Sequence, residues 1–197
     1  MRVGILAVQG DVLEHTEMLR ELGADPVPLR DAEKLNGIDA LIIPGGESTT
    51  IGKLISYRNI AKVISKFAEE GNPVLGTCAG AILLAKKVRD SMLGDTEQFT
   101  LGLMNISVTR NAYGRQSYSF ESKLMMKGIG EVRGAFIRAP IIANAWSPAE
   151  ITGYMDHPSM GRVGVAAQQE NLLAISFHPE ITGEKKIYEY FIGLAKK

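Results

Sequence analysis

The sequence is poor in the residues that build disulfides and metal sites. Its 197 residues contain one cysteine, Cys78, and three histidines, His15, His157 and His178. One cysteine cannot form a disulfide within the chain, and no histidine stands at a familiar zinc-ligand spacing from the cysteine or from carboxylates. We therefore expect no metal site, and we expect His15 and His157 to lie on the surface.

The chain also lacks a charge excess and a long apolar run. It has 22 basic residues (Lys and Arg) and 22 acidic ones, so no net field attracts nucleic acid or an anionic membrane. No apolar stretch reaches the ~18 residues that suggest a membrane-spanning helix, and the first residues show no signal-peptide pattern. These absences predict a cytoplasmic protein with neither a nucleic acid nor a membrane as its partner.

Two nucleotide-binding motifs are missing as well, Gly-x4-Gly-Lys-Ser/Thr and Gly-x-Gly-x-x-Gly. The sequence has instead the stretch PGGESTT at residues 44–50, directly after an apolar run. At the carboxyl end of a strand, Gly45 and Gly46 can adopt backbone angles closed to other residues and can present a bare N–H to a ligand. An ordinary strand-to-helix loop is the alternative interpretation.

The order of the patterns predicts an α/β fold. Apolar, β-prone runs alternate with helical patterns in the first part of the chain, which is typical of a parallel sheet, whereas short β-like runs dominate after residue 100. We expect a single domain over residues 1–197, built as a three-layer, flavodoxin-like open sheet with a mostly parallel core, antiparallel additions and helices on both faces. Residues 86–100 are expected to form a polar surface excursion, and Asp11 to cap the first helix.

The single cysteine lies where an apolar strand runs into a helix, in residues 73–84 (PVLGTCAGAILL). Gly76 and Gly80 flank Cys78 in the spacing of a nucleophile elbow, which lets a strand turn sharply into a helix. The first free N–H groups of such a helix favour the reactive thiolate. Cys78 is therefore a candidate nucleophile, and a small buried apolar residue is the alternative.

A second apolar strand delivers His178 at its end, followed by Pro179 and Glu180. A histidine oriented by a neighbouring acid is the base half of a catalytic triad, although a lone histidine after a strand is more often structural. Together with the elbow cysteine, the pattern predicts a triad of Cys78, His178 and Glu180.

Two arginines stand at or just after predicted strand ends, Arg110 and Arg138. A guanidinium offers a planar fork of donors to a carboxylate, so both are candidates for recognising an acidic group. Solvated surface charge is the alternative.

The two short stretches that hold the triad, GTCAG at 76–80 and SFHPE at 176–180, resemble the class I, or triad, glutamine amidotransferase superfamily. Further motifs resemble one of its families, the glutaminase subunits of pyridoxal 5'-phosphate synthase (PdxT/SNO). These motifs are PGGESTT at 44–50, RN-x-x-GRQ at 110–116, SFE at 119–121 and FIRAP at 136–140.

The resemblance implies hydrolysis of L-glutamine to glutamate and ammonia through a thioester on Cys78, without a cofactor. His178 would act as base and then as acid, and Glu180 would orient it. The backbone N–H groups of Gly46 and Ala79 would stabilise the oxyanion. The glutamine contacts that family matching implies are Gly46, Glu47, Ser48, Arg110, Ile137 and Arg138.

The resemblance also implies a partner, a (β/α)8-barrel synthase subunit of the PdxS/SNZ family that receives the ammonia, in a large assembly on a dodecameric synthase core. Members of the family are weak glutaminases until this subunit docks, and Gln9 with the Gly45–Gly46 peptide is our candidate for the region that docking sets in order. The alternatives are a glutaminase subunit of another amidotransferase, a cysteine hydrolase or chaperone of the DJ-1/PfpI type, and a non-catalytic binding subunit.

Overall fold

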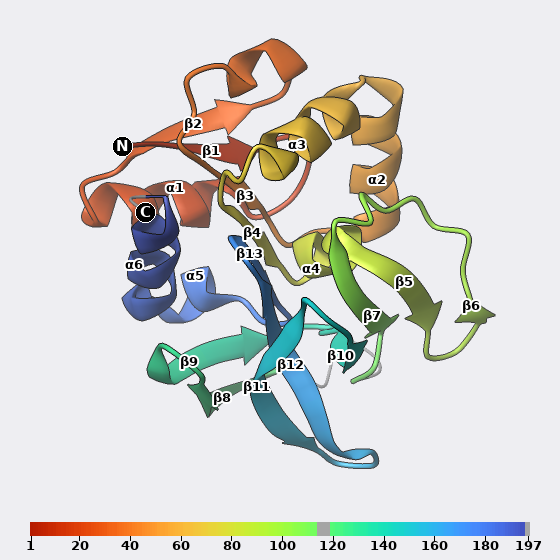
Figure 1. Cartoon of the computed structure of the whole chain (residues 1–197). Helices are drawn as coiled ribbons and strands as arrows, with labels where there is room; N and C mark the ends of the chain where they lie inside the picture. The colour runs from red at the N-terminus through yellow and green to blue at the C-terminus, as the bar shows by residue number, and fades with distance from the viewer. Residues whose placement is uncertain (114–118, 196–197) are drawn as a thin grey trace.

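The computed structural model describes residues 1–113 and 119–195 (Figure 1). Within these residues the strands form one mixed sheet, ordered β2-β1-β3-β4-β13-β12-β10-β7-β5-β6, and β11, β8 and β9 branch from β12. None of the described helices is long and apolar enough to cross a membrane.

The parallel half of the sheet is its core. β1 pairs in parallel with β2 and β3, β3 with β4, and β4 with β13. β1, β3, β4 and β13 are short, mostly buried apolar runs, which is the pattern of a covered parallel sheet, whereas β2 lies at the edge and is largely exposed or half-buried. Their bounds are Arg2–Leu6 for β1, Asp25–Leu29 for β2, Ala40–Ile43 for β3, Val74–Thr77 for β4 and Leu172–Ile175 for β13.

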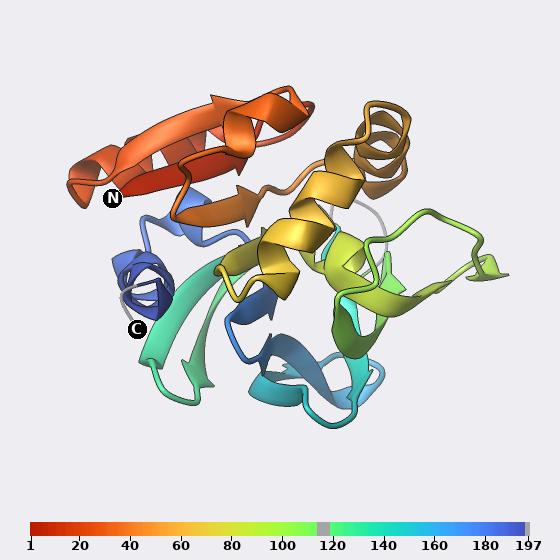
Figure 2. The same cartoon turned by 45° about the horizontal axis from the view of Figure 1, so that its top comes forward.

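Helices cover both faces of this core (Figures 1 and 2). Alternate residues of a strand enter different apolar clusters. Ile42 of β3 joins the cluster that contains residues of α1 and α6, whereas Ile43 joins the cluster of α2, α3 and α4. The predicted three-layer arrangement is confirmed. The helices are α1 (Val12–Glu21), α2 (Ser48–Tyr57), α3 (Ile60–Glu69), α4 (Ala79–Leu84), α5 (Pro179–Thr182) and α6 (Lys185–Leu194), with a 3₁₀ helix, η1, at Ala32–Leu35.

Antiparallel strands extend the core, as expected. β12 pairs antiparallel with β13, and β8 forms a hairpin with β9 that lies beside α6 in both cartoon views. The remaining strands are β5 (Ala85–Asp90), β6 (Gly94–Asp95), β7 (Met104–Arg110), β8 (Phe120–Met126), β9 (Gly130–Phe136), β10 (Ile141–Ala145), β11 (Glu150–His157) and β12 (Gly161–Gln169).

The predicted polar excursion at residues 86–100 is partly wrong, because β5 and β6 lie there. β5 is held by its backbone pairing with β7, while most of its side chains stay partly or fully exposed. A strand stabilised in this way shows little apolar alternation for a sequence pattern to reveal.

The predicted elbow depends on close packing between backbones at its two glycines. A Cβ at Gly80 would lie 2.0 Å from the carbonyl oxygen of Ile43, and one at Gly76 would lie 2.6 Å from the carbonyl carbon of Gly80. These glycines therefore let α4 approach β3 and β4 more closely than any side chain permits.

We predict that Gly80→Ala lowers the free energy of unfolding by at least about 2 kcal/mol, because backbone must move to admit the methyl group. Gly193→Ala in α6 is the matched control, since no atom lies within 4 Å of the added Cβ. It should change stability by no more than about 1 kcal/mol. Urea unfolding followed by circular dichroism measures both, and equal midpoints for the two variants would contradict the close-packing explanation.

Candidate active site

Cys78 occupies a strained turn between β4 and α4. Its backbone has φ 47° and ψ −100°, a conformation that costs energy for a residue with a side chain. The turn is held because the Cys78 N–H donates to Ile175 O at 2.8 Å. The side chain is nearly buried, with 7% of its residue surface exposed. The strand, sharp turn and helix predicted around Cys78 are therefore present.

His178 and Glu180 lie close to this turn, at the end of β13 and the start of α5. His178 Nδ1 donates to Glu180 Oε1 at 2.7 Å, and both residues are buried. Pro179 stands between them at the first position of α5, where its fixed φ suits the start of a helix. Cys78 lies close enough to the His178 ring to raise the pKa of His178. Because Nδ1 faces the carboxylate, Nε2 is the ring nitrogen left for the sulfur.

Asp11 is a second acid at this site, although its position before α1 predicted a helix cap. It precedes α1, but its side chain makes no capping hydrogen bond. Instead its Oδ2 lies 3.3 Å from His178 Nδ1. The hydrogen bond to His178 lowers the pKa of Asp11 in spite of partial burial, so this carboxylate is ionised at neutral pH.

The surroundings of His178 favour its charged form. Burial by itself favours the neutral ring, but hydrogen bonds to Asp11, Cys78 and Glu180, together with negative charge at Cys78, raise the pKa of His178 to about 12. The ring is therefore an imidazolium at neutral pH. A cation beside a cysteine favours the thiolate, which is the nucleophilic form.

The expectation that His15 lies on the surface is wrong, since the side chain is fully buried. Its Nδ1 lies 2.6 Å from the Tyr188 hydroxyl, and its Nε2 lies 3.3 Å from Thr77 Oγ1 and 3.7 Å from Glu180 Oε1. Burial lowers the pKa of His15, so the ring is neutral and acts as a hydrogen-bonding group behind His178 and Glu180. Its spacing from Val12 and Leu19 on α1 was the signal that could have placed it on the buried face.

The glycine loop after β3 packs against the triad. A Cβ at Gly45 would lie 2.3 Å from His178 Cε1, and Gly46 has φ +154°. Gly45 O accepts a hydrogen bond from the Asp11 N–H at 3.2 Å, and the Glu47 N–H donates to Gln9 Oε1 at 2.8 Å. The structure therefore brings Gln9 and the Gly45–Gly46 peptide together.

Glu47 and Ser48 lie at the start of α2, next to this loop. The Glu47 carboxylate accepts from the N–H groups of Thr49 and Thr50 at 2.9 and 2.7 Å, so it caps the helix. These hydrogen bonds lower the pKa of Glu47 although partial burial opposes them. The Ser48 hydroxyl donates to Gln98 Oε1 at 3.3 Å.

Arg110 ends β7 and reaches the same helix start. Its Nη1 donates to Thr49 Oγ1 at 3.0 Å and to Gln98 Oε1, and its Nε lies 3.0 Å from the buried carboxylate of Asp90. Gln98, which touches two of the residues implied to bind glutamine, was not predicted from the sequence. It lies in a polar stretch between β6 and β7 that carries no motif.

Ile137 and Arg138 follow β9 and lie beside the elbow. The Cys78 thiol lies 3.9 Å from Ile137 O. Arg138 is exposed and has φ 47°, the second strained backbone at the site. The GRQ part of the predicted motif, at residues 114–116, lies outside the described residues.

His157 was expected in an exposed loop, and this expectation is also wrong. It ends β11 and is buried against the Tyr113 ring, 4.5 Å between ring centres, while its Nε2 lies 3.1 Å from Ala112 O. Because Tyr113 is contributed by a segment some forty residues earlier, local sequence could not reveal this packing.

Asp11, His178 and Glu180 are the described group whose potential metal-ligand atoms cluster, all within 4.8 Å of one another. The hydrogen bond from His178 Nδ1 to Glu180 accounts for this closeness, because a protonated ring nitrogen is no metal ligand.

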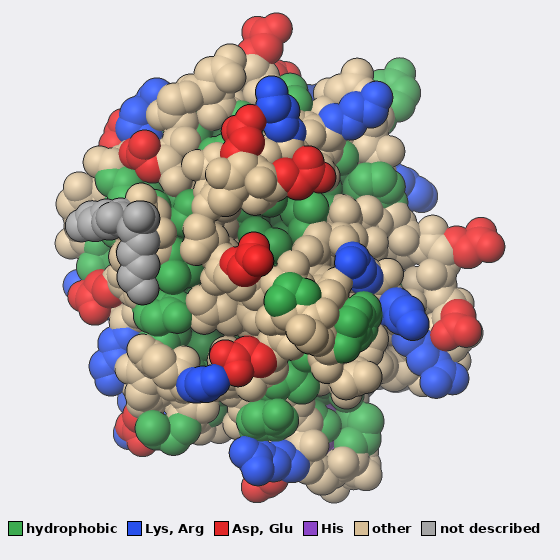
Figure 3. All heavy atoms as spheres, in the orientation of Figure 1, with side chains coloured by type: hydrophobic (Ala, Val, Ile, Leu, Met, Phe, Trp, Pro, Cys, Tyr) green, Lys and Arg blue, Asp and Glu red, His purple; other side chains and the backbone are tan. Residues whose placement is uncertain are grey.

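In the space-filling view acidic and basic side chains are interspersed (Figure 3), in line with the balanced composition.

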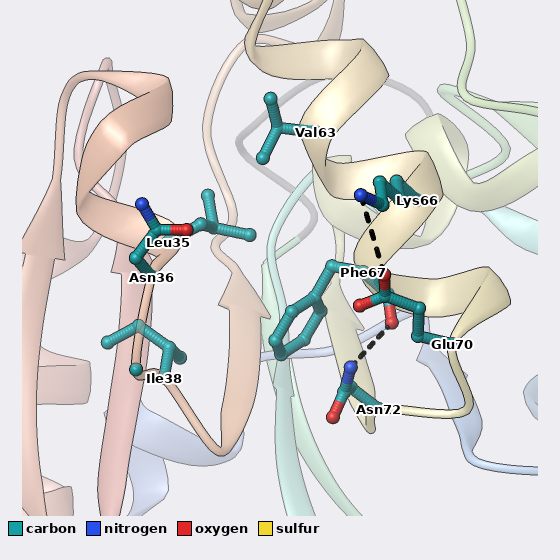
Figure 4. A pocket seen from close by; sticks show the side chains of 9 residues that line it. Leu35, Asn36, Ile38, Val63, Lys66, Phe67, Glu70 and Asn72 are labelled. Atoms are coloured by element: carbon teal, nitrogen blue, oxygen red, sulfur yellow. Dashed lines mark hydrogen bonds and ion pairs between the residues drawn. The ribbon is translucent and has the colours of Figure 1, made fainter.

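A pocket of about 290 Å³ lies elsewhere, between η1 and α3 (Figure 4). It is lined by Leu35, Phe67 and Asn72, among others, and Lys66 and Glu70 form an ion pair on its rim at 3.7 Å. Asn72 precedes β4, whereas Cys78 follows it. The pocket therefore lies near the amino end of this strand, and the elbow lies at its carboxyl end.

The fold and the site together define a class of protein. A solved crystal structure described as a glutamine amidotransferase superposes with a TM-score of 0.89 at 43% sequence identity, over 99% of both chains. The chain has the α/β open-sheet fold of the class I glutamine amidotransferases, as the sequence predicted.

The model of the SNO glutamine amidotransferase family matches residues 5–197. A pyridoxal 5'-phosphate synthase subunit PdxT of Hyperthermus butylicus is 52% identical over 195 residues, which cover 98% of this chain and 96% of the relative. The PdxT subunit of Pyrobaculum arsenaticum is 51% identical over 188 residues, 92% of each chain. The chain belongs to the SNO glutamine amidotransferase family, which confirms the resemblance seen in its motifs.

We predict that Cys78→Ala lowers the pKa of His178. The substitution removes a hydrogen bond and a negative charge that both favour the imidazolium. Long-range ¹H–¹⁵N NMR spectra should show a protonated His178 ring at pH 7 to 8 in the wild type and a titration at lower pH in the variant. The buried His15, neutral in both proteins, is the internal reference. A neutral His178 ring in the wild type at pH 7 would contradict the charge assignment.

Proposed function

We propose that this chain is the glutaminase subunit of a pyridoxal 5'-phosphate synthase and serves vitamin B6 biosynthesis. It hydrolyses L-glutamine and supplies the ammonia to a synthase subunit. The observation that carries the chemistry is the strained Cys78 beside an imidazolium of His178 that Glu180 holds at 2.7 Å. Membership of the family, together with PdxT relatives aligned over nearly the whole chain, supports the pathway.

Acylation begins with the Cys78 thiolate, which attacks the side-chain amide carbon of glutamine and forms a carbon–sulfur bond. The carbonyl oxygen becomes an oxyanion. The His178 imidazolium then donates its proton to the amide nitrogen, the carbon–nitrogen bond breaks, ammonia leaves, and a γ-glutamyl thioester remains. Glu180 keeps the ring oriented and stabilises its positive charge.

Deacylation uses the same base, which is now neutral. His178 takes a proton from water as the water oxygen attacks the thioester carbon. The second tetrahedral intermediate collapses, the carbon–sulfur bond breaks, and glutamate leaves. The site returns to a Cys78 thiolate beside the His178 imidazolium, so no net proton is consumed at the ring.

The oxyanion is stabilised by the backbone N–H groups of Gly46 and Ala79. Ala79 is the first residue of α4, where an N–H has no partner within its own helix. Gly46 lies in the loop that packs on His178, in a conformation suited to glycine. Its neighbours Gly45 and Gln9 form the region whose arrangement changes when the synthase subunit docks.

The groups proposed to recognise glutamine come from three segments: the loop and start of α2, the end of β7, and the residues after β9. Arg138 is exposed, and Arg110 is held in place by Asp90, so the two guanidinium groups provide positive charge for the α-carboxylate. The carbonyl of Ile137 lies near the sulfur. The full set proposed to contact the substrate is Gly46, Glu47, Ser48, Arg110, Ile137 and Arg138.

The ammonia passes to a (β/α)8-barrel subunit of the PdxS/SNZ family, and the complex forms on a dodecameric core of that subunit. We place this assembly in the cytoplasm. The partner is supported by the PdxT relatives, whose name describes a subunit of a synthase. The location is supported by the single, unpaired cysteine.

The purified chain should release glutamate from glutamine slowly alone and faster when the barrel synthase subunit is added. Cys78→Ala should lose at least about 10³-fold of this activity, because no thioester can form. Glu17→Gln, on an exposed position of α1, is the control and should keep wild-type activity. A coupled glutamate dehydrogenase assay measures the product. Full activity of Cys78→Ala, or no stimulation by the barrel subunit, would contradict the proposal.

The rival assignment, a glutaminase that serves another synthase, is tested by the product of the complex. The barrel subunit with its sugar-phosphate substrates should form pyridoxal 5'-phosphate from glutamine only when this chain is present. With ammonium ions as nitrogen source, it should do so without the chain. Glutamine hydrolysis without transfer of its nitrogen into pyridoxal 5'-phosphate would favour the rival.

A further inference from the structure

Two carboxylates face one ring nitrogen at the active site. His178 Nδ1 lies 2.7 Å from Glu180 Oε1 and 3.3 Å from Asp11 Oδ2. The two acids differ in their surroundings, because the side chain of Glu180 is 0% exposed and that of Asp11 is 34% exposed. A triad needs one orienting acid, so the second carboxylate calls for an explanation.

We propose that Asp11 is a positioning residue for the triad, whose carboxylate stabilises the His178 imidazolium and thereby keeps the Cys78 thiolate available at lower pH. This proposal rests on the nucleophile and base assigned under the proposed function. It goes beyond them, since Asp11 belongs neither to the triad nor to the residues proposed to contact glutamine.

A structural role at the helix start does not explain the position of Asp11. Its side chain makes no hydrogen bond to the N–H groups of α1, the usual reason for an aspartate at this position. The carboxylate is turned toward His178 instead, and the hydrogen bond to that ring lowers the pKa of Asp11. The acid therefore carries its negative charge whenever the imidazolium is present.

The backbone of Asp11 contacts the loop that carries the second oxyanion donor. Its N–H donates to Gly45 O at 3.2 Å, and its Oδ2 lies so close to Gly45 that a Cβ there would be 2.6 Å away. One residue thus joins the catalytic base to the Gly45–Gly46 loop. Substitution of the side chain leaves the N–H bond in place, so an experiment can isolate the carboxylate.

The effect of Asp11 on His178 can be measured separately from the effects of the other titratable groups around the ring. Cys78 faces the ring from the β4–α4 turn, and Glu180 faces it from α5. His15 of α1 lies behind Glu180, with a lowered pKa that keeps it neutral. Cys78 and Glu180 are needed for the reaction itself, whereas Asp11 can be neutralised without removing a triad member.

The test is the pH dependence of Cys78 alkylation by iodoacetamide, which reports thiolate and needs neither glutamine nor a partner. Cys78 is the single cysteine of the chain, so the label reports this site alone. In Asp11→Asn the midpoint of the rate profile should move up by about one pH unit, and labelling below the midpoint should slow about tenfold. Asp11→Glu, which keeps the charge, should recover at least part of the shift.

Glu17→Gln is the matched control, because it removes one negative charge from an exposed position of the same helix. Its midpoint should equal that of the wild type. Asp11→Ser is measured beside Asp11→Asn, with thermal unfolding of each variant, so that a folding defect in one does not decide the result. The proposal is overturned if the folded Asp11 variants share the midpoint of Glu17→Gln, or if Asp11→Glu shifts as far as Asp11→Asn.

The same variants separate this proposal from the proposed function. If alkylation shifts as expected but the wild-type complex hydrolyses no glutamine, Asp11 supports a reactive cysteine of another activity. If the complex is an active glutaminase and alkylation does not respond to Asp11, the function stands and the role of Asp11 falls. In an active complex, the acid limb of kcat/KM should move to higher pH in Asp11→Asn by the same amount as the alkylation midpoint.

Discussion

The hydrogen bond between His178 Nδ1 and Glu180 is the interaction on which the candidate site depends. It is 2.7 Å long, and both residues are buried. A buried carboxylate without a partner costs several kcal/mol, so the charge of Glu180 and the proton of His178 stabilise each other. The bond also fixes the orientation of the ring, because Nδ1 is occupied and Nε2 is left to face the sulfur of Cys78. The reactive geometry is therefore a consequence of satisfying a buried charge.

Elements from both ends of the chain support this pair. Tyr188 of α6 lies 2.6 Å from His15 of α1, and His15 reaches Thr77 of β4 and Glu180 of α5. Burial and the charge of Glu180 raise the pKa of Tyr188 well above its usual value, so the phenol remains a neutral hydrogen-bonding group. Because the Glu180 carboxylate near Nε2 can only accept, we assign the hydrogen of the neutral His15 ring to Nε2, and the Tyr188 hydroxyl then donates to Nδ1. The proposed triad is thus positioned by the core, whereas the residues proposed to bind glutamine stand at strand and helix ends.

The parts of this protein that could be predicted from sequence are those whose signal is local. The strand before Cys78, the glycines around it and the spacing from His178 to Glu180 all lie within a few residues, and the structure brings them together. Asp11, His15 and Gln98 were misassigned or missed because each has a simpler local explanation, as a helix cap, a surface histidine and a loop glutamine. The helical spacing of His15 could indicate a buried face, but the partners of all three residues come from the packing of α1 and of the β6–β7 segment against distant strands, and no short pattern encodes those partners.

The two carboxylates on His178 differ in what can disturb them. Glu180 is enclosed by the core, so its effect on the ring is constant. Asp11 is partly exposed and lies between Gln9 and α1, and its N–H holds the carbonyl of Gly45. The planar Gly45–Gly46 peptide directs the Gly46 N–H away from that carbonyl, so the bond from Asp11 helps to set where this donor points. A displacement of residues 9–11 would therefore change both the charge beside His178 and the direction of the Gly46 N–H, the proposed oxyanion donor, in one movement.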